Sequence, residues 1–237
     1  DIMDDAATVK ADWQKKGIYE TIEELYSEVW VYGRQDIYDP VREYEIPESI
    51  AEKLYFTGYI PRRIPERSQA EEMRLELGIM KNENLVTVTT GGGGDGYHVL
   101  DSYLKILEQM KKQSILPPFQ SVLVTGPFLS RVHKKDILER AEMLEIESYE
   151  FFPKMETLIA ASDIIVSMGG YNTMCEVLSL KKMAVVVPRE TPRMEQHIRA
   201  QAFNKEGLIE FISWNDLTAV LLQKKIEDML GSRADYV

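Results

Sequence analysis

The chain has 237 residues, 44% of them hydrophobic, and a formal net charge of −11, which fits a globular protein of one large or two small domains. The acidic excess argues against a general nucleic-acid binder, because phosphate backbones are held mainly by clustered Lys and Arg. A single cysteine, Cys175, excludes an intrachain disulfide framework, and three histidines far apart in the sequence (His98, His133 and His197) argue against a structural zinc site.

Targeting signals are missing from the sequence. No apolar run approaches the roughly 18 residues of a transmembrane helix, and no charged-then-apolar leader resembles a signal peptide. We therefore expect a cytoplasmic protein, with membrane contact of the intact protein left open. Asp1 is not an initiator Met, and no strand precedes the helix-like opening. From this we expect an amino-terminal domain upstream.

The first part of the chain lacks a regular alternation of strands and helices. EVWVYG (28–33) and LYFTGYI (54–60) are predicted strands, separated by loop and short helix. IPRRIPERSQAEE (60–72) combines two prolines with charged, turn-like positions, which is typical of a hinge. We predict a domain boundary here, with 1–61 as the remnant of an amino-terminal domain and its connector, and 62–237 as a second domain.

From residue 84 onward, β-branched runs alternate with amphipathic helical patterns. The predicted strands are LVTVTT (85–90), SVLVTG (121–126), SYEFF (148–152), DIIVSM (163–168), MAVVVP (183–188) and LIEFI (208–212). The helical patterns between them are 97–112, 134–144, 155–161, 173–180 and 195–207, and a last helix is expected over 214–230 with Asn215 or Asp216 near its cap. This alternation predicts an α/β fold with a doubly wound, Rossmann-like parallel sheet, on which ligands bind at the carboxyl ends of strands.

The first glycine cluster, TGGGGDG (90–96), leaves a predicted strand and enters a helix. At Gly91, Gly92, Gly93 and Gly94 only backbone N–H groups are presented, so a phosphate or a sugar hydroxyl could approach closely. The alternative is a flexible connector, because glycine in a tight turn needs no ligand. The cluster is not a Walker loop, since no Lys-Ser or Lys-Thr follows, and it fits the dinucleotide fingerprint poorly.

The second cluster is SMGGYNTMCE (167–176). Gly169 and Gly170 precede a helix that we expect from about Asn172, which places Thr173 in its first turn and Glu176 on the same face. A helix start of this kind suits an anion such as phosphate, whereas the acid suits a neutral polyhydroxyl group such as ribose. The alternative is a capping box, in which Glu176 bonds back to the helix start.

A third loop, PRETPRMEQHIRA (188–200), follows the strand MAVVV. It leads into a helix that begins with Glu195 and Gln196, an acid and an amide that suit a polyhydroxyl ligand. Taken alone, the loop is better explained as a plain helix start with an acid in its first turn.

In this order the motifs TGGGGDG, EFFPKMETLIAASDIIVSMGGYNTMCE and VVVPRETPRMEQHIRA resemble the carboxyl-terminal half of GT-B glycosyltransferases of family 28, over about residues 85 to 230. The stretches SEVWVYG and YFTGYIPR look like the joint between the two halves in a bacterial subgroup of predicted glycosyltransferases. The resemblance implies that 62–237 is a nucleotide-sugar-binding domain.

The resemblance also implies roles for individual residues. The backbone of Phe152, with Met155 nearby, matches the position that reads the nucleotide base. Gly170 and Thr173, in the turn with Gly169 and Asn172, match the diphosphate-binding turn, and Glu176 matches the acid that binds the ribose hydroxyls. Gly91 to Gly94 match a loop facing the interdomain cleft near the diphosphate and acceptor. Glu195 and Gln196 match a pair that contacts the donor sugar, where the family's peptidoglycan members carry two amides.

The activity that the resemblance implies is inverting, metal-independent transfer of a hexosyl group from a UDP-sugar to an unknown acceptor, without a cofactor. Leaving-group stabilisation is expected from helix N-termini, in agreement with the absence of a D-x-D triplet. The catalytic base is expected outside this chain, and His98 fits packing or capping better. We therefore expect the fragment alone to be inactive. Two alternatives remain, a UDP-sugar 2-epimerase-like isomerase and a non-catalytic or split nucleotide-sugar-binding module.

Overall fold

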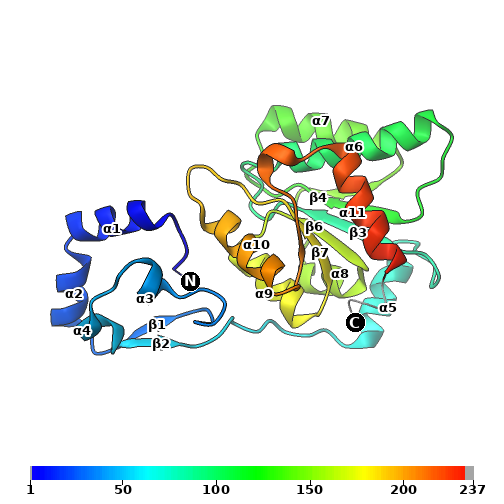
Figure 1. Ribbon diagram of the computed structural model, residues 1–237. Helices are drawn as coiled ribbons and strands as arrows, with labels where there is room; N and C mark the ends of the chain where they lie inside the picture. Colours follow the sequence, from blue (N-terminus) through cyan, green and yellow to red (C-terminus); the bar gives the residue numbers. More distant parts are fainter. Residues whose placement is uncertain (1, 233–237) are drawn as a thin grey trace.

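A computed structural model describes residues 2–232 and contains two parallel sheets (Figure 1). The smaller sheet pairs β1 (Val29–Val31) with β2 (Leu54–Phe56). The larger sheet has six parallel strands in the order β5-β4-β3-β6-β7-β8. Its strands are β3 (Leu85–Thr89), β4 (Gln120–Val124), β5 (Glu147–Tyr149), β6 (Ile164–Ser167), β7 (Met183–Val186) and β8 (Glu210–Phe211). The predicted fold class, a Rossmann-like parallel α/β sheet, is confirmed.

Helices cover both faces of the large sheet, as Figure 1 shows. On one face α6 (Tyr97–Lys112), α7 (Arg131–Met143) and α11 (Ala219–Gly231) pack on alternate strand residues such as Val88, Val166 and Val185. On the other face lie α5 (Arg67–Glu76), α8 (Met155–Ala161), α9 (Tyr171–Ser179) and α10 (Glu195–Lys205). The strands are buried on both sides, which explains their nearly continuous apolar sequences.

Four predicted elements need corrected boundaries. The predicted strands 148–152 and 208–212 are shorter in the structure, because β5 and β8 are the edge strands and pair on one side only. The predicted hinge 60–72 ends earlier, since α5 begins at Arg67 with a capping box between Glu66 and Gln69. The last helix is capped by Thr218, which accepts a hydrogen bond from Leu221 N (3.1 Å); Asn215 and Asp216 lie in a preceding 3₁₀ turn, Trp214–Asp216.

The amino-terminal part has a small core of its own. Four helices surround the two-stranded sheet: α1 (Ala6–Lys15), α2 (Ile18–Leu25), α3 (Pro40–Glu43) and α4 (Glu48–Ala51). Tyr44 is fully buried among Val9, Ile22, Ile46 and Ile50. The assignment of this amino-terminal part as the remnant of a larger domain stays a prediction, as does the domain boundary between residues 61 and 62. Asp1 and 233–237, the end of the predicted second domain, lie outside the described residues.

The connector between the two parts is held along α9 and α10. Tyr59 packs edge-on against Phe203 of α10, with ring centroids 5.1 Å apart. Ile60 N donates to the hydroxyl of Tyr171 at 3.2 Å, and Arg62 N donates to Ser179 Oγ at 2.9 Å. The connector therefore crosses the helix that begins at the second glycine cluster.

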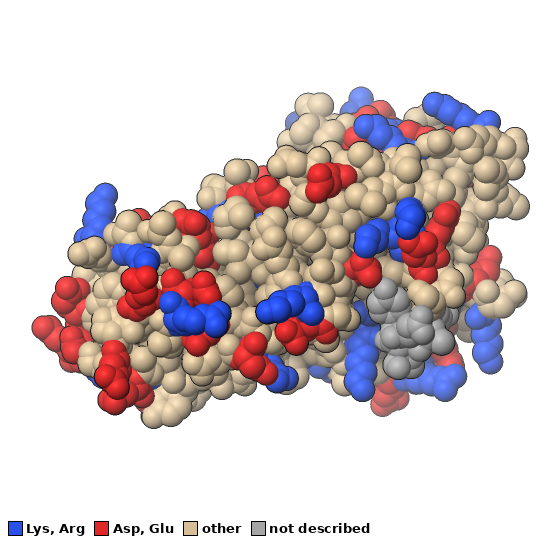
Figure 2. Space-filling model, in the orientation of Figure 1, with Lys and Arg blue, Asp and Glu red and all other residues tan. Residues whose placement is uncertain are grey.

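Charged side chains of both signs are scattered over the face seen in Figure 2, with acidic ones frequent over the amino-terminal part. This distribution fits the net charge of −11. Between residues 2 and 232, no helix combines the length and apolarity needed to cross a membrane.

Candidate functional site

The predicted site residues come from loops that follow the carboxyl ends of strands in the large sheet. β3, β6 and β7 are neighbours, with Thr89 paired to Ser167 and Ser167 to Val186. Both glycine clusters and the loop before α10 leave these strands at the same level. Parallel sheets bind ligands at these carboxyl ends. The structure therefore brings Gly91–Gly94, Gly169–Glu176 and Glu195–Gln196 to one side of the sheet.

The two glycines before α9 differ in backbone conformation and in the space around them. Gly169 has a φ of +74°, and a Cβ there would lie 2.8 Å from Val186 Cγ1. Gly170 is the N-cap of α9, with a φ of −58°, and a Cβ there would meet nothing within 4 Å. Folding thus requires glycine at 169, whereas the space beside Gly170 is open to a ligand.

The first turn of α9 offers free donors. Its first helical hydrogen bond runs from Met174 N to Gly170 O (3.0 Å), so the N–H groups of Tyr171, Asn172 and Thr173 precede it. In the described part of the chain no side-chain cap hydrogen bond is made at its N-cap, Gly170, and the helix begins one residue before the predicted start. Thr173 is therefore not the N-cap, and the capping-box alternative for Glu176 is wrong.

Glu176 lies on α9, half-buried. Burial, and then the negative charge of Glu156 on α8, raise its pKa to about 7, while Arg62 acts in the opposite direction. Among residues 2–232 no hydrogen bond or ion pair engages its carboxylate. A poorly solvated acceptor next to free N–H groups is the arrangement expected for a ligand with hydroxyls beside an anion.

Arg62, at the end of the connector, is the residue of this site that sequence reasoning missed. Its Nη2 donates to Asn172 Oδ1 at 2.5 Å, and its Nε is buried without a partner in the described part of the chain. A cation therefore stands beside the start of α9, and the side-chain oxygen of Asn172 is already bonded. The stretch IPRR (60–63) indicated only a hinge. The contact between Arg62 and Asn172 joins positions 110 apart, so the local sequence around Arg62 gives no sign of it.

The four-glycine loop interlocks with the loop after β4. At Gly93, with a φ of +85°, a Cβ would lie 2.2 Å from Thr125 O. Phe128 N donates to Gly92 O at 2.8 Å. The loop is thus fixed by its neighbour, unlike the flexible connector of the alternative, while Gly91 and Gly94 face open space.

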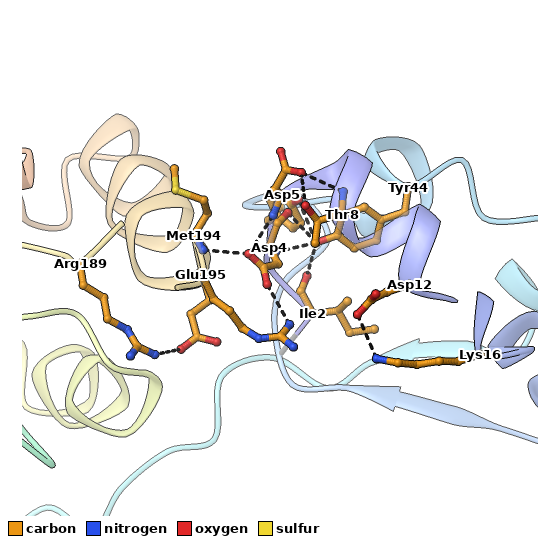
Figure 3. Close-up of polar contacts among 12 residues, drawn as sticks. Ile2, Asp4, Asp5, Thr8, Asp12, Lys16, Tyr44, Arg189, Met194 and Glu195 are labelled. Carbon is orange, nitrogen blue, oxygen red and sulfur yellow. Dashed lines mark hydrogen bonds and ion pairs between the residues drawn. The ribbon is translucent and has the colours of Figure 1, made fainter. Parts of the chain in front are cut away.

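The loop before α10 is tied to the glycine loop by Arg189. Its Nη1 contacts Asp95 Oδ2 at 3.1 Å and its Nη2 contacts Glu195 Oε1 at 3.0 Å. Arg189 N also donates to Gln196 Oε1 at 3.2 Å. The carboxylate of Glu195 is thus paired with the guanidinium of Arg189, as Figure 3 shows. The side chain of Gln196 binds the backbone of Arg189 in the loop before α10.

Phe152 and Met155 lie at the far side of the site, after β5. The ring of Phe152 is half-buried and packs edge-on against Tyr149, with centroids 5.0 Å apart. Its side chain serves packing, and the reading of a nucleotide base by its backbone stays a prediction. Met155 starts α8 next to Glu156, whose charge acts on Glu176. α8 thereby links this side to the acid on α9.

The sequence predicted a packing or capping role for His98 and a mechanism without a metal ion. His98 packs edge-on against Trp214, with centroids 5.1 Å apart, in agreement with a packing role. Over residues 2–232 no group of three or more His, Cys, Asp or Glu side chains is arranged to hold a metal ion.

Comparison with known proteins places these features in a family. The model of the "Glycosyltransferase family 28 C-terminal domain" matches residues 86–236. UDP-N-acetylglucosamine--N-acetylmuramyl-(pentapeptide) pyrophosphoryl-undecaprenol N-acetylglucosamine transferases of Streptococcus pneumoniae, strains JJA and TIGR4, are 30% identical over 120 residues. The match covers 44% of this chain and 34% of those relatives, so the chain spans about a third of their length.

Solved structures agree on the fold. The glycotransferase of kitacinnamycin superimposes with a TM-score of 0.59 at 14% identity, covering 98% of this chain and 54% of that one. MurG of Acinetobacter baumannii gives a TM-score of 0.55 at 12% identity, covering 94% of this chain and 68% of that one. Both are GT-B glycosyltransferases. The chain therefore belongs to glycosyltransferase family 28 and carries the carboxyl-terminal domain of that family.

Proposed function

We propose that this chain is the donor-binding half of an inverting, metal-independent glycosyltransferase that uses a UDP-sugar. The observation that carries the proposal is the pairing of an unbonded, half-buried Glu176 with the open helix start at Gly170. The helix start suits the diphosphate, and the carboxylate suits the ribose hydroxyls.

In the proposed reaction an acceptor hydroxyl attacks the anomeric carbon from the face opposite UDP, and the bond to the diphosphate oxygen breaks. The charge that develops on UDP is stabilised by the N–H groups at the start of α9 and by Arg62. Neither donor has to move to do so, which is the advantage of a preorganised site. The base that takes the proton from the acceptor belongs to another part of the intact enzyme, so the chain alone binds donor without turnover.

The donor sugar in this proposal meets Glu195 and Gln196. The streptococcal relatives are named as N-acetylglucosamine transferases. Here Glu195 is paired with Arg189, so the surface offered to the sugar combines an acid, a cation and an amide. We propose a hexosyl donor. The isomerase alternative gains no support from these relatives, which are named as transferases.

The proposal is tested by calorimetric titration of the chain with UDP-N-acetylglucosamine and UDP-glucose, with ADP and GDP as controls for the base. Uridine nucleotides are expected to bind at micromolar to millimolar strength, and the purine nucleotides at least about tenfold more weakly. Equal binding of all four ligands would show an anion site without base recognition. No binding of any of them would contradict the proposed function.

A further inference from the structure

Asp4 precedes α1 and is buried against the loop that starts α10, although 190 positions separate it from Met194. Its Oδ1 accepts a hydrogen bond from Met194 N at 2.8 Å, and its Oδ2 accepts one from Arg193 Nη1 at 3.0 Å (Figure 3). The Asp4 side chain is 10% exposed and that of Arg193 is 57% exposed. The contact is therefore a charge-assisted pair of hydrogen bonds that is buried at Asp4 and open to solvent at Arg193.

These bonds supply a cap that α10 lacks. Met194 is the N-cap residue of this helix and has no side-chain cap hydrogen bond of its own. The N-terminus of a helix carries unpaired N–H groups and partial positive charge, which a carboxylate satisfies. Asp4 does so from a distant segment, so the start of α10 is fixed by the amino-terminal part of the chain.

Asp4 is itself anchored in the small amino-terminal core. Its backbone N donates to the hydroxyl of Tyr44 at 2.8 Å, and Tyr44 is fully buried. Asp5 N donates to Asp4 Oδ1 at 2.9 Å. The carboxylate is thus held in one orientation, as a positioning group has to be.

The other end of the contact adjoins the proposed sugar site. Glu195 and Gln196 follow Met194 directly. Arg189 holds Glu195 at 3.0 Å and, through its backbone, Gln196 at 3.2 Å. The loop from Arg189 to Gln196 is therefore fixed at one end by Arg189 and at the other by Asp4.

We propose that Asp4 is a positioning residue for the donor sugar: it sets the start of α10 and thereby the placement of Glu195 and Gln196. This inference rests on the proposed function, because it assigns the sugar to that pair. Asp4 touches neither nucleotide nor sugar. Its loss should weaken the part of the affinity that the sugar contributes and leave the UDP part intact.

The test compares the affinities for UDP, UDP-N-acetylglucosamine and UDP-glucose in the wild type, Asp4→Ala and Asp4→Asn. The matched control is Glu24→Ala, which removes an exposed acid of α2 in the same amino-terminal part of the chain. Asp4→Ala is expected to weaken the better-bound UDP-sugar about tenfold and UDP less than about twofold. Asp4→Asn keeps an acceptor for Met194 N and should give a smaller loss, and Glu24→Ala should match the wild type.

Equal losses for UDP and UDP-sugar, or no loss for either, would overturn the proposal. Hydrogen exchange of the unliganded chain gives a second, independent readout at Met194 N and at Ile198 N, which donates to Met194 O at 2.9 Å. Asp4→Ala, or Asp4→Asn if the first variant does not fold, should speed exchange at both amides and not at Met174 N of α9. Unchanged exchange would overturn the positioning role. If the wild type binds no UDP-sugar, the proposed function fails, and exchange alone still decides whether Asp4 fixes α10.

Discussion

Burial and the negative charge of Glu156 together raise the pKa of Glu176 to about 7. Glu176 is therefore only partly ionised near neutral pH in the unliganded chain. Its carboxylate has no partner among residues 2–232, so the folded protein holds an acid whose environment disfavours its charge. A ligand that donates hydrogen bonds to this acid would offset that penalty.

The first prediction concerns the substitution Glu176→Gln. UDP affinity should fall by about 1–3 kcal/mol, because a charge-assisted hydrogen bond to ribose is lost. The melting temperature of the unliganded protein at pH 8 should rise, because a poorly solvated charge is removed. Calorimetry and thermal unfolding measure the two effects, with Glu142→Gln, an exposed acid of α7, as the control. Unchanged affinity in a folded Glu176→Gln protein would sink the ribose assignment.

The second prediction is a pH dependence of binding. The ligand needs the ionised carboxylate, so affinity for a UDP-sugar should fall about tenfold from pH 8 to pH 6, as protons compete at a pKa of about 7. A UDP-sugar is the better probe than UDP, because its diphosphate is esterified at both ends and does not titrate in this range. Glu156→Gln should move the midpoint to lower pH, and Glu176→Gln should abolish the dependence. A flat profile for the wild type would contradict the prediction.

Stability should respond to pH in the opposite sense. The pKa of Glu176 is raised from 4.5 to about 7 on folding, so the folded state binds more protons than the unfolded state between these values. The contribution of Glu176 to the free energy of unfolding is therefore most favourable below pH 4.5 and declines as pH rises to 7. The difference in melting temperature between the wild type and Glu176→Gln, followed across this range, isolates that contribution.

A third prediction contrasts the two glycines before α9. Gly170→Val should fold normally, because its φ of −58° is accessible to valine and its Cβ meets nothing within 4 Å. The new side chain should block the diphosphate, and so weaken UDP strongly and uridine much less. Gly169→Val should lose stability instead, because of its φ of +74° and the contact with Val186. Equal losses of uridine and UDP binding in Gly170→Val would indicate general disruption.

The fourth prediction concerns the domain boundary. A chain that starts at residue 62 keeps α5, whose Met73 packs with Leu85, Val122 and Leu158, and should therefore fold. It lacks Tyr59, which packs on Phe203, so its melting temperature should lie below that of a chain starting at residue 57. Thermal unfolding of both chains checks this, and equal melting temperatures would mean that Tyr59 contributes nothing.

The sheet was predictable because most of its strands are short β-branched runs, and β3, β4 and β6 are followed by glycines. The helix start at Gly170 followed from the same pattern, since a strand, a glycine turn and a helix determine where the chain places its free N–H groups, whereas the ligand-binding role of Gly170 and Glu176 stays a prediction. Local sequence also suggested a long hinge over 60–72, but Glu66 and Gln69 form a capping box and begin α5 inside that stretch. Similarly, Thr218 caps the last helix, although Asn and Asp, the residue types at 215 and 216, have the higher capping propensity.

Contacts across the fold could not be predicted from one sequence. The bond from Arg62 to Asn172 joins positions 110 apart, and that from Met194 to Asp4 joins positions 190 apart. Each depends on how two packed units meet, and no local propensity encodes it. These contacts surround the predicted site residues and decide which of their polar groups stay free.

The most direct test of the central claim is a nuclear magnetic resonance titration of UDP into the isotope-labelled chain, in excess EDTA and again with magnesium. We predict that the backbone amides from Gly170 to Thr173 shift most and that the amides of Gly91 to Gly94 shift as well. The affinity should be the same in both buffers, since N–H groups and not an ion meet the diphosphate. Binding that requires magnesium, or shifts confined to other parts of the chain, would contradict this prediction.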